Sequence, residues 1–239
     1  MSEQTLEILN AEIVACRKCP RLVEYRERIA REKRRAFLDW DYWGRPVPGF
    51  GDTNARLFIF GLAPAAHGAN RTGRVFTGDR SGDFLYNALY RAGFANQPNS
   101  FKRGDGLELR DAYIAAAIRC APPANKPLPN ELENCRPYFE TELAILKPKA
   151  ILALGGIAMK TYLSTLKSRG TIKSIAAFPF RHGAIFDFPE NLPRLYLSYH
   201  PSQQNTFTGK LTPAMLLKVL SKIRNYLEHT EPTGSAPRH

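Results

Sequence analysis

The sequence contains neither a long hydrophobic run nor an apolar leader. None of its apolar stretches approaches the roughly 18 consecutive residues that a membrane-spanning helix requires. The first sixteen residues, MSEQTLEILNAEIVAC, carry acidic groups and lack the central apolar segment of a secretory signal. The sequence therefore predicts a cytoplasmic protein with no membrane association.

Acidic residues are also scarce. The chain has 22 Asp and Glu against 34 Lys and Arg, which gives a net charge of +12. This excess favours a polyanionic partner such as nucleic acid, although a solvated basic face is the alternative. With 239 residues, 44% of them hydrophobic, the chain can bury one sizeable core. We predict a single domain over residues 1–228 and a disordered tail over 229–239, which has no apolar period.

Only four cysteines are present, and their spacing is uneven. Cys16 and Cys19 form a close pair, whereas Cys120 and Cys135 lie far downstream. Disulfides are not expected in a reducing compartment, so the thiols indicate metal binding or core packing. Four thiolates suit either zinc or an iron–sulfur cluster, and the spacing does not distinguish them. The close first pair favours a closed structural metal site over simple core packing.

Short apolar runs alternate with helical patterns along the chain. The runs that are rich in branched and aromatic residues predict strands over 57–60, 113–118, 150–154 and 195–197. Helices are predicted over 5–15, along the charged segment 21–35, after the possible caps Ser81 and Asn130, over 155–166, and from Thr212 onward. This alternation predicts an α/β fold, a three-layer α/β/α sandwich with a short, mostly parallel central sheet.

Four unusual segments follow the predicted strands: GLAPAAHG, RCAPPANKP, LGG and SYHPSQQN. Parallel sheets bind ligands beyond the carboxyl ends of their strands. We therefore expect all four loops to meet in one crevice.

The four cysteines, GLAPAAHGANRTGRVFTGD and HPSQQNT together resemble the family 5, or b-type, branch of the uracil-DNA glycosylase superfamily. The resemblance extends from Cys16 to about residue 220. It implies an α/β/α sandwich, cleavage of the bond between uracil and deoxyribose, and a structural [4Fe-4S] cluster bound by Cys16, Cys19, Cys120 and Cys135.

The resemblance also implies three catalytic candidates. Where relatives carry a polar residue and a general base, this chain has Leu62 and Ala63, so the carboxylate comes from Asp79. The alternative role for Asp79 is helix capping. His200 matches the histidine that donates a hydrogen bond to the uracil carbonyl, although a lone histidine is more often structural. Asn125 is an auxiliary candidate that positions water.

A second group of residues is expected to contact the extruded base. Phe76 resembles the aromatic residue that stacks on an extruded base, with core packing as its alternative. The loop residues Gly61, Leu62 and Ala63 are expected to line the base site. Relatives with a narrower substrate range have an asparagine where this chain has Ala116. Without an amide to hydrogen-bond the uracil edge, the chain is predicted to accept more deaminated bases, including hypoxanthine and xanthine.

The expected partner is single- or double-stranded DNA containing deaminated bases, bound by a monomer. Predicted phosphate contacts, with solvated surface charge as the alternative, are Arg71, Arg74, Lys126 and Lys210. A polar loop is expected to enter the duplex, namely Ser202, Gln203, Gln204 and Asn205. A non-catalytic nucleic-acid-binding protein with a structural metal is the main alternative, and a zinc hydrolase is disfavoured because four cysteines leave no open position.

Overall fold

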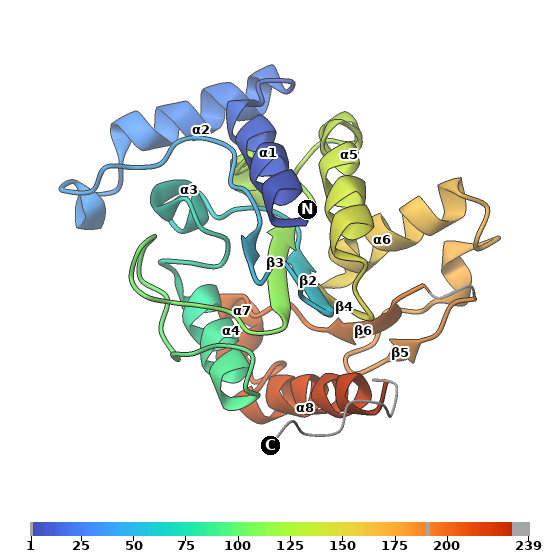
Figure 1. Cartoon of the computed structure of the whole chain (residues 1–239). Helices are drawn as coiled ribbons and strands as arrows, with labels where there is room; N and C mark the ends of the chain where they lie inside the picture. Colours follow the sequence, from blue (N-terminus) through green and yellow to red (C-terminus); the bar gives the residue numbers. More distant parts are fainter. Residues whose placement is uncertain (1, 190–191, 231–239) are drawn as a thin grey trace.

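A six-stranded sheet forms the centre of the computed structural model, which describes residues 2–189 and 192–230. The strand order is β1-β3-β2-β4-β6-β5 (Figure 1). The four central strands are parallel: β2 (Leu57–Gly61), β3 (Ala112–Ala116), β4 (Ala150–Leu154) and β6 (Arg194–Ser198). Two short antiparallel strands, β1 (Phe50–Gly51) and β5 (Ile185–Phe186), pair at the edges. The predicted central strands are confirmed.

Side chains alternate across the sheet, and each face is covered by helices. On β2, Leu57 and Ile59 belong to one buried core, whereas Phe58 and Phe60 belong to the other. The first core lies under α4 (Arg80–Arg91) and α8 (Pro213–His229). The second lies under α1 (Ser2–Ala15), α5 (Pro129–Leu146) and α6 (Gly156–Ser168). Figure 1 shows the sheet between these two layers, which confirms the predicted α/β/α sandwich.

Helix starts differ from the predictions at two positions. Thr212 caps α8 as expected, because its hydroxyl accepts from the Met215 amide. Asp79, not Ser81, caps α4. The helix α5 begins at Pro129, before the predicted cap Asn130, and the Glu131 carboxylate accepts from the Leu128 amide.

The other segments are short or irregular. The charged segment forms α2 (Pro20–Glu32), and residues 39–52 are irregular apart from β1. Five elements are too short to leave a periodic signal: α3 (Ala69–Thr72), α7 (Gln203–Phe207) and the 3-10 turns η1 (Arg35–Phe37), η2 (Pro123–Asn125) and η3 (Ile175–Ala177). His229, the first residue of the predicted tail, ends α8, and residues 231–239 lie outside the described residues.

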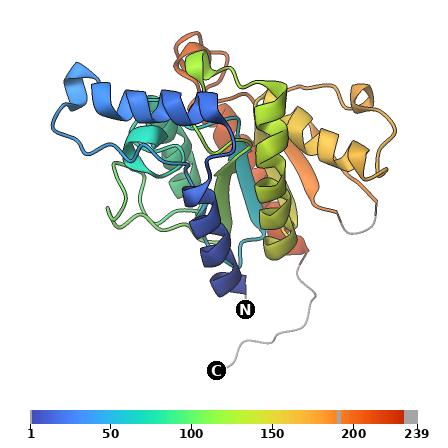
Figure 2. The same ribbon diagram turned by 90° about the horizontal axis from the view of Figure 1, so that it is seen from above.

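The loops that were expected to form a crevice gather at one end of the sheet. Figure 2 shows the orange segment that contains α7 beside the lime segment that contains η2, at the end opposite the N-terminus.

None of the helices formed by the described residues is long and apolar enough to cross a bilayer.

Candidate active site

A cavity of about 430 Å³ lies beyond the carboxyl ends of the central strands. It brings together residues from three of the four predicted loops. Those singled out from the sequence are Leu62, Ala63, Phe76, Asp79, Ala116, Asn125, His200, Ser202 and Gln203. The fourth loop supports the site from behind, because a Cβ added to Gly155 would lie 3.4 Å from the His200 Cβ. The expected crevice therefore exists, and Asp79 and His200 open into the same space.

Asp79 lines this cavity and also caps α4. Its Oδ1 accepts from the Gly82 amide at 2.9 Å, while Oδ2 lies close to Gly68, where an added Cβ would be 2.2 Å away. Burial raises the pKa of Asp79 above its ordinary value, which the Gly82 amide and the Arg71 charge oppose without reversing. The two roles considered from the sequence are therefore compatible, since the cap uses only one carboxylate oxygen.

His200 lines the same cavity and follows the end of β6 by two residues. Burial lowers its pKa to about 4, so the imidazole is neutral near pH 7. Its ring forms no hydrogen bond with any residue in 2–189 or 192–230, whereas the Asn205 side chain donates to the His200 carbonyl at 2.9 Å. The fold thus fixes the backbone of His200 and leaves its ring available for a ligand.

Phe76 and His200 together form an aromatic wall. Their ring centroids are 5.7 Å apart at an interplanar angle of 35°. A Cβ at Gly61 would lie 2.8 Å from the Phe76 ring and 3.7 Å from the His200 Nε2, so glycine is required here to keep this space open. Phe76 has a φ of 50°, a costly conformation for a bulky residue that often marks a functional position. Its ring faces the cavity as well as packing against the core.

Ala116 ends β3 directly opposite Gly61 and lines the cavity with a methyl group. This side chain offers no hydrogen-bonding group to the cavity. Asn125 follows on the turn η2, where both Ala124 and Asn125 have a positive φ, at 52° and 56°. Two consecutive left-handed residues without glycine indicate local strain, which is typical of functional turns.

Two predicted phosphate contacts are wrong, because the structure buries both arginines. Arg74 is 4% exposed and forms a bidentate ion pair with Asp105, at 2.8 and 2.7 Å. Arg71 is 3% exposed and donates to the carbonyls of His67 and Gly78. Its guanidinium also stacks on the rings of Phe37 and Trp40, at 3.9 and 4.0 Å. Both arginines hold the loop that leads to Asp79.

Removing the Arg74 side chain should therefore affect stability rather than DNA contacts. Burial disfavours ionisation of Asp105, but Arg74 and three backbone amides hold its pKa well below its usual range. Arg74→Ala would leave that carboxylate unpaired, at a cost of about 3–5 kcal/mol. We expect a clearly lower Tm by calorimetry, whereas Lys126→Ala, at an exposed position, should leave Tm unchanged. An unchanged Tm in Arg74→Ala would contradict this role.

The remaining DNA-binding candidates are exposed or half-buried, and Ser202 and Gln203 line the cavity. Lys126 and Lys210 are exposed, and Lys210 lies 4.9 Å from the centre of the Tyr199 ring. Ser202 caps α7, which makes its hydroxyl part of the fold, while Gln203 and Gln204 are exposed on that helix. Asn205 is used internally, through its bond to His200.

The sequence interpretation missed Phe207 and Arg80. Phe207 ends α7, is 67% exposed, and lies 5.0 Å from the Arg80 guanidinium. Arg80 follows Asp79 and lines the cavity. A large apolar side chain left in solvent beside such a cavity is a signal that only the burial pattern provides, because phenylalanine in the sequence predicts core packing.

The four cysteines come from the α1–α2 junction, the loop after β3, and α5. Cys19, Cys120 and Cys135 share one small cluster with Leu22 and Ile118. Two polar groups approach the sulfurs: Arg26 Nη1 lies 3.6 Å from Cys120 Sγ, and Asn134 Nδ2 lies 3.5 Å from Cys19 Sγ. Burial raises the pKa of Cys120 to about 12 and that of Cys135 to about 11, so thiolates here require compensating positive charge.

The four thiols lie close enough to act on one another, because Cys16 and Cys19 both contribute to the raised pKa values of Cys120 and Cys135. Within residues 2–189 and 192–230, no three His, Cys, Asp or Glu side chains are arranged to hold one metal ion. The buried Arg26, with a side-chain Nε that lacks a hydrogen-bond partner, adds positive charge beside these sulfurs.

Comparison with known proteins places this cavity in context. Residues 48–224 match the family model described as the uracil DNA glycosylase superfamily. The type-5 uracil-DNA glycosylase of Mycobacterium tuberculosis is 53% identical over 87% of this chain and 76% of its own length. The type-5 enzyme of Thermus thermophilus is 51% identical over 89% of this chain and 94% of its own length. A type-4 uracil-DNA glycosylase of Pyrobaculum aerophilum is 33% identical over 69% of this chain and 67% of its own length.

Proposed function

Because this chain belongs to the uracil DNA glycosylase superfamily, we propose that it excises uracil from DNA by hydrolysing the N-glycosidic bond. The observation that carries this proposal is the shared cavity, into which a carboxylate and a neutral imidazole open from different loops. A base buried in a duplex cannot reach such a cavity, so the target nucleotide must first leave the stack.

The cavity supplies charge at both ends of the breaking bond. As the C1′–N bond lengthens, the sugar gains positive charge and the base gains negative charge. The Asp79 carboxylate stabilises the sugar cation or orients the attacking water, and Asn125 assists in placing that water. The neutral His200 ring donates a hydrogen bond to the uracil carbonyl, where negative charge develops only in the transition state.

Base placement uses the aromatic wall formed by Phe76 and His200. The Phe76 ring stacks on the extruded base, since every base presents a π-face. The segment that carries Gln203 and Gln204 enters the gap left in the duplex, and the exposed Phe207 at the end of this helix is suited to act as an apolar wedge. Lys126 and Lys210 bind phosphates. We expect the protein to act in the cytoplasm as a monomer on single- or double-stranded DNA.

The direct test is single-turnover excision from a duplex that contains one uracil opposite guanine. Cleavage at the abasic product should appear with wild type and not with heat-inactivated protein. Tight DNA binding without any base release would instead favour a non-catalytic nucleic-acid-binding protein.

The substrate range should extend to hypoxanthine and xanthine. Ala116 presents no hydrogen-bonding group to the base. A purine in the cavity therefore leaves no polar side chain at this position without a partner. Ala116→Asn should keep uracil excision and reduce hypoxanthine excision by about tenfold or more, because the amide would require a matching base edge. Parallel time courses on uracil, hypoxanthine and xanthine duplexes measure this. An unchanged range in the variant would remove Ala116 as the source of breadth.

We propose that Cys16, Cys19, Cys120 and Cys135 hold a [4Fe-4S] cluster, which supplies a structural link between the N-terminal helices, the loop after β3, and α5. The buried thiols of Cys120 and Cys135 and the Arg26 guanidinium beside Cys120 support this assignment.

Cys120→Ser tests the assignment through metal content. Wild type purified without chelator should contain about four irons per chain and be brown, while Cys120→Ser should lose most of the iron and show a lower Tm. A colourless wild type with stoichiometric zinc would overturn the cluster assignment without affecting the excision assay.

A further inference from the structure

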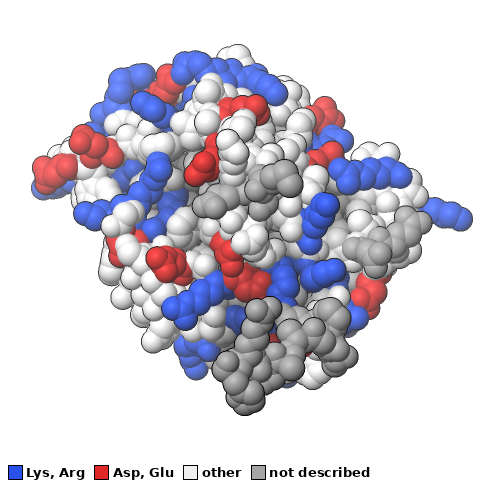
Figure 3. Space-filling model, in the orientation of Figure 1, with Lys and Arg blue, Asp and Glu red and all other residues white. Residues whose placement is uncertain are grey.

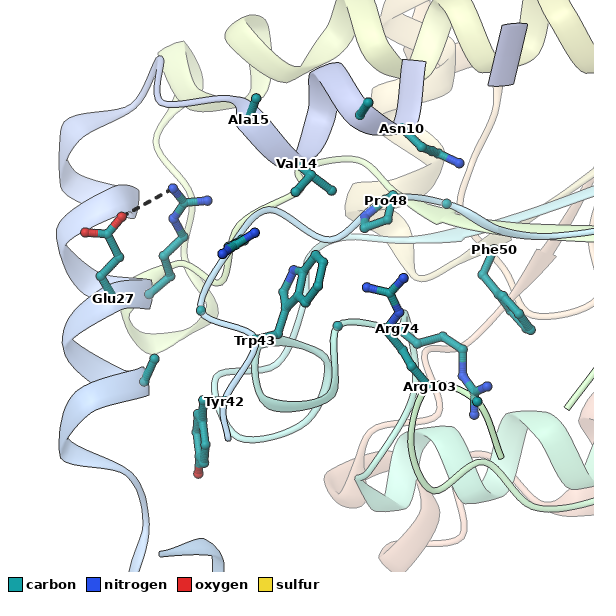
Figure 4. A pocket seen from close by; sticks show the side chains of 18 of the residues that line it. Asn10, Val14, Ala15, Glu27, Tyr42, Trp43, Pro48, Phe50, Arg74 and Arg103 are labelled. Atoms are coloured by element: carbon teal, nitrogen blue, oxygen red, sulfur yellow. Dashed lines mark ion pairs between the residues drawn. The ribbon is translucent and has the colours of Figure 1, made fainter. Parts of the chain in front are cut away.

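A second, larger cavity lies away from the catalytic one, between α1, α2 and the irregular segment 42–50. Its volume is about 1340 Å³, and it shares no lining residue with the catalytic cavity. Figure 4 shows the Trp43 indole in the middle of this pocket, with Arg74 and Arg103 on one side and Glu27 on the opposite wall. Lys and Arg side chains also gather over the neighbouring α2 in Figure 3.

The walls of this pocket carry an excess of guanidinium groups. Six arginines line it against two glutamates: Arg17, Arg26, Arg31, Arg45, Arg74 and Arg103. Arg17 pairs with Glu27 at 2.6 Å, and Arg74 pairs with Asp105. Arg45 and Arg103 form no ion pair with any residue that the structure describes. Their charge is therefore available for a ligand.

Both arginines have exposed side chains that lie beside the same aromatic ring. Their guanidinium groups lie 5.7 and 4.6 Å from the centre of the Trp43 ring. Trp43 is itself fixed, since its Nε1 donates to the Pro46 carbonyl at 3.0 Å. The loop that carries Arg103 is fixed by the Asp105 carboxylate, which accepts from three amides of that loop. Such preorganisation reduces the cost of ordering these side chains when a ligand binds.

A third guanidinium lines the pocket from a buried position. Arg26 is only 2% exposed, its Nη2 lies 3.6 Å from Glu27 Oε1, and its Nη1 lies 3.6 Å from Cys120 Sγ. Its Nε has no hydrogen-bond partner among the residues that the structure describes. An acceptor atom of a ligand that reached this donor would satisfy it.

We propose that this pocket binds a phosphate-bearing ligand, either a free nucleotide or the backbone of a nucleic-acid strand outside the catalytic cavity. Guanidinium groups match phosphate oxygens through paired hydrogen bonds. Trp43, Val14 and Pro48 offer apolar surface for a base and a sugar. The shared recognition element is the phosphate, and the two sources differ in the length of the chain attached to it.

Calorimetric titration tests the proposal with two probes, thymidine 5′-monophosphate and a uracil-free single strand of about 15 nucleotides. Thymidine is the control without phosphate. The pocket variant is Arg45→Ala/Arg103→Ala, and the charge-matched control is Arg110→Ala/Arg181→Ala, whose arginines are exposed and do not line this pocket. Each lost guanidinium should weaken binding about tenfold.

Two results support the site. If the monophosphate binds to wild type and loses affinity only in the pocket variant, the ligand is a free nucleotide. If only the strand shows this dependence, the ligand is a nucleic-acid backbone. Equal affinities in the pocket variant and in the charge-matched control, for both probes, would overturn the proposal. Tm and uracil excision at saturating DNA should be unchanged in the pocket variant, which separates this test from that of glycosylase activity.

Discussion

Asp79→Asn is expected to slow uracil excision by about a thousandfold while leaving the fold intact. The Asn side chain cannot stabilise the sugar cation or activate water, and loss of such a group costs about 10²–10⁴ in rate. Asparagine caps helices as well as aspartate does, so the bond to the Gly82 amide is retained. Single-turnover excision measures the rate, and calorimetry measures Tm.

The sign of the stability change gives a second criterion. The raised pKa of Asp79 means that the folded protein favours the neutral carboxyl, so ionisation at neutral pH costs stability. Asp79→Asn should therefore have a Tm equal to or above that of wild type. Asp83→Asn, one turn along α4 at an exposed position, is the matched control and should excise uracil normally. A wild-type rate in Asp79→Asn would reduce Asp79 to a helix cap.

The same raised pKa predicts how excision depends on pH. The rate should fall on acidification as Asp79 takes up a proton, at a pH above the ordinary value of 3.8 for aspartate. Asp79→Asn should lack this decline in its residual activity. Rate profiles measured at saturating DNA, where binding no longer limits, provide the comparison.

His200→Ala should slow excision by about 10²–10³-fold, the usual cost of removing one donor to a developing anion. With a pKa of about 4, His200 stays neutral between pH 5 and 8, so its titration should not appear in the rate profile over that range. His200→Gln keeps a donor and should recover part of the loss. His229→Ala, at the exposed end of α8, is the control. A His200→Ala variant as fast as wild type would assign the imidazole a structural role.

The fold was largely predictable because its strands are fully buried and nearly continuous in apolar character. Runs such as 57–60 and 150–154 can only be central strands of a covered sheet, and Thr212-Pro213 is an unambiguous helix start. The edge strands β1 and β5 were missed because two residues carry no period. The start of α4 was misplaced because Asp79 and Ser81 are both good caps, and only the geometry distinguishes them.

The sequence predicted the site residues that the ends of the strands position. It predicted less well the residues whose role depends on whether their side chains are buried. Loops after parallel strands must meet at one edge, which brings Asp79, His200 and Asn125 to one cavity. Arg71 and Arg74 were misassigned because an arginine in a loop looks the same in sequence whether it faces DNA or a buried carboxylate. Phe207 was missed because a phenylalanine is expected to be buried, and only the folded chain shows that this one is exposed.

The most direct measurement compares excision of uracil and of 5-fluorouracil by wild type, Asp79→Asn and His200→Ala. Fluorine stabilises the departing base anion, so it should substitute for the hydrogen bond from His200 but not for the carboxylate at the sugar. We predict that the rate deficit of His200→Ala relative to wild type shrinks with 5-fluorouracil, while that of Asp79→Asn stays the same. Equal changes in both deficits would contradict the assignment of these two residues to opposite ends of the bond.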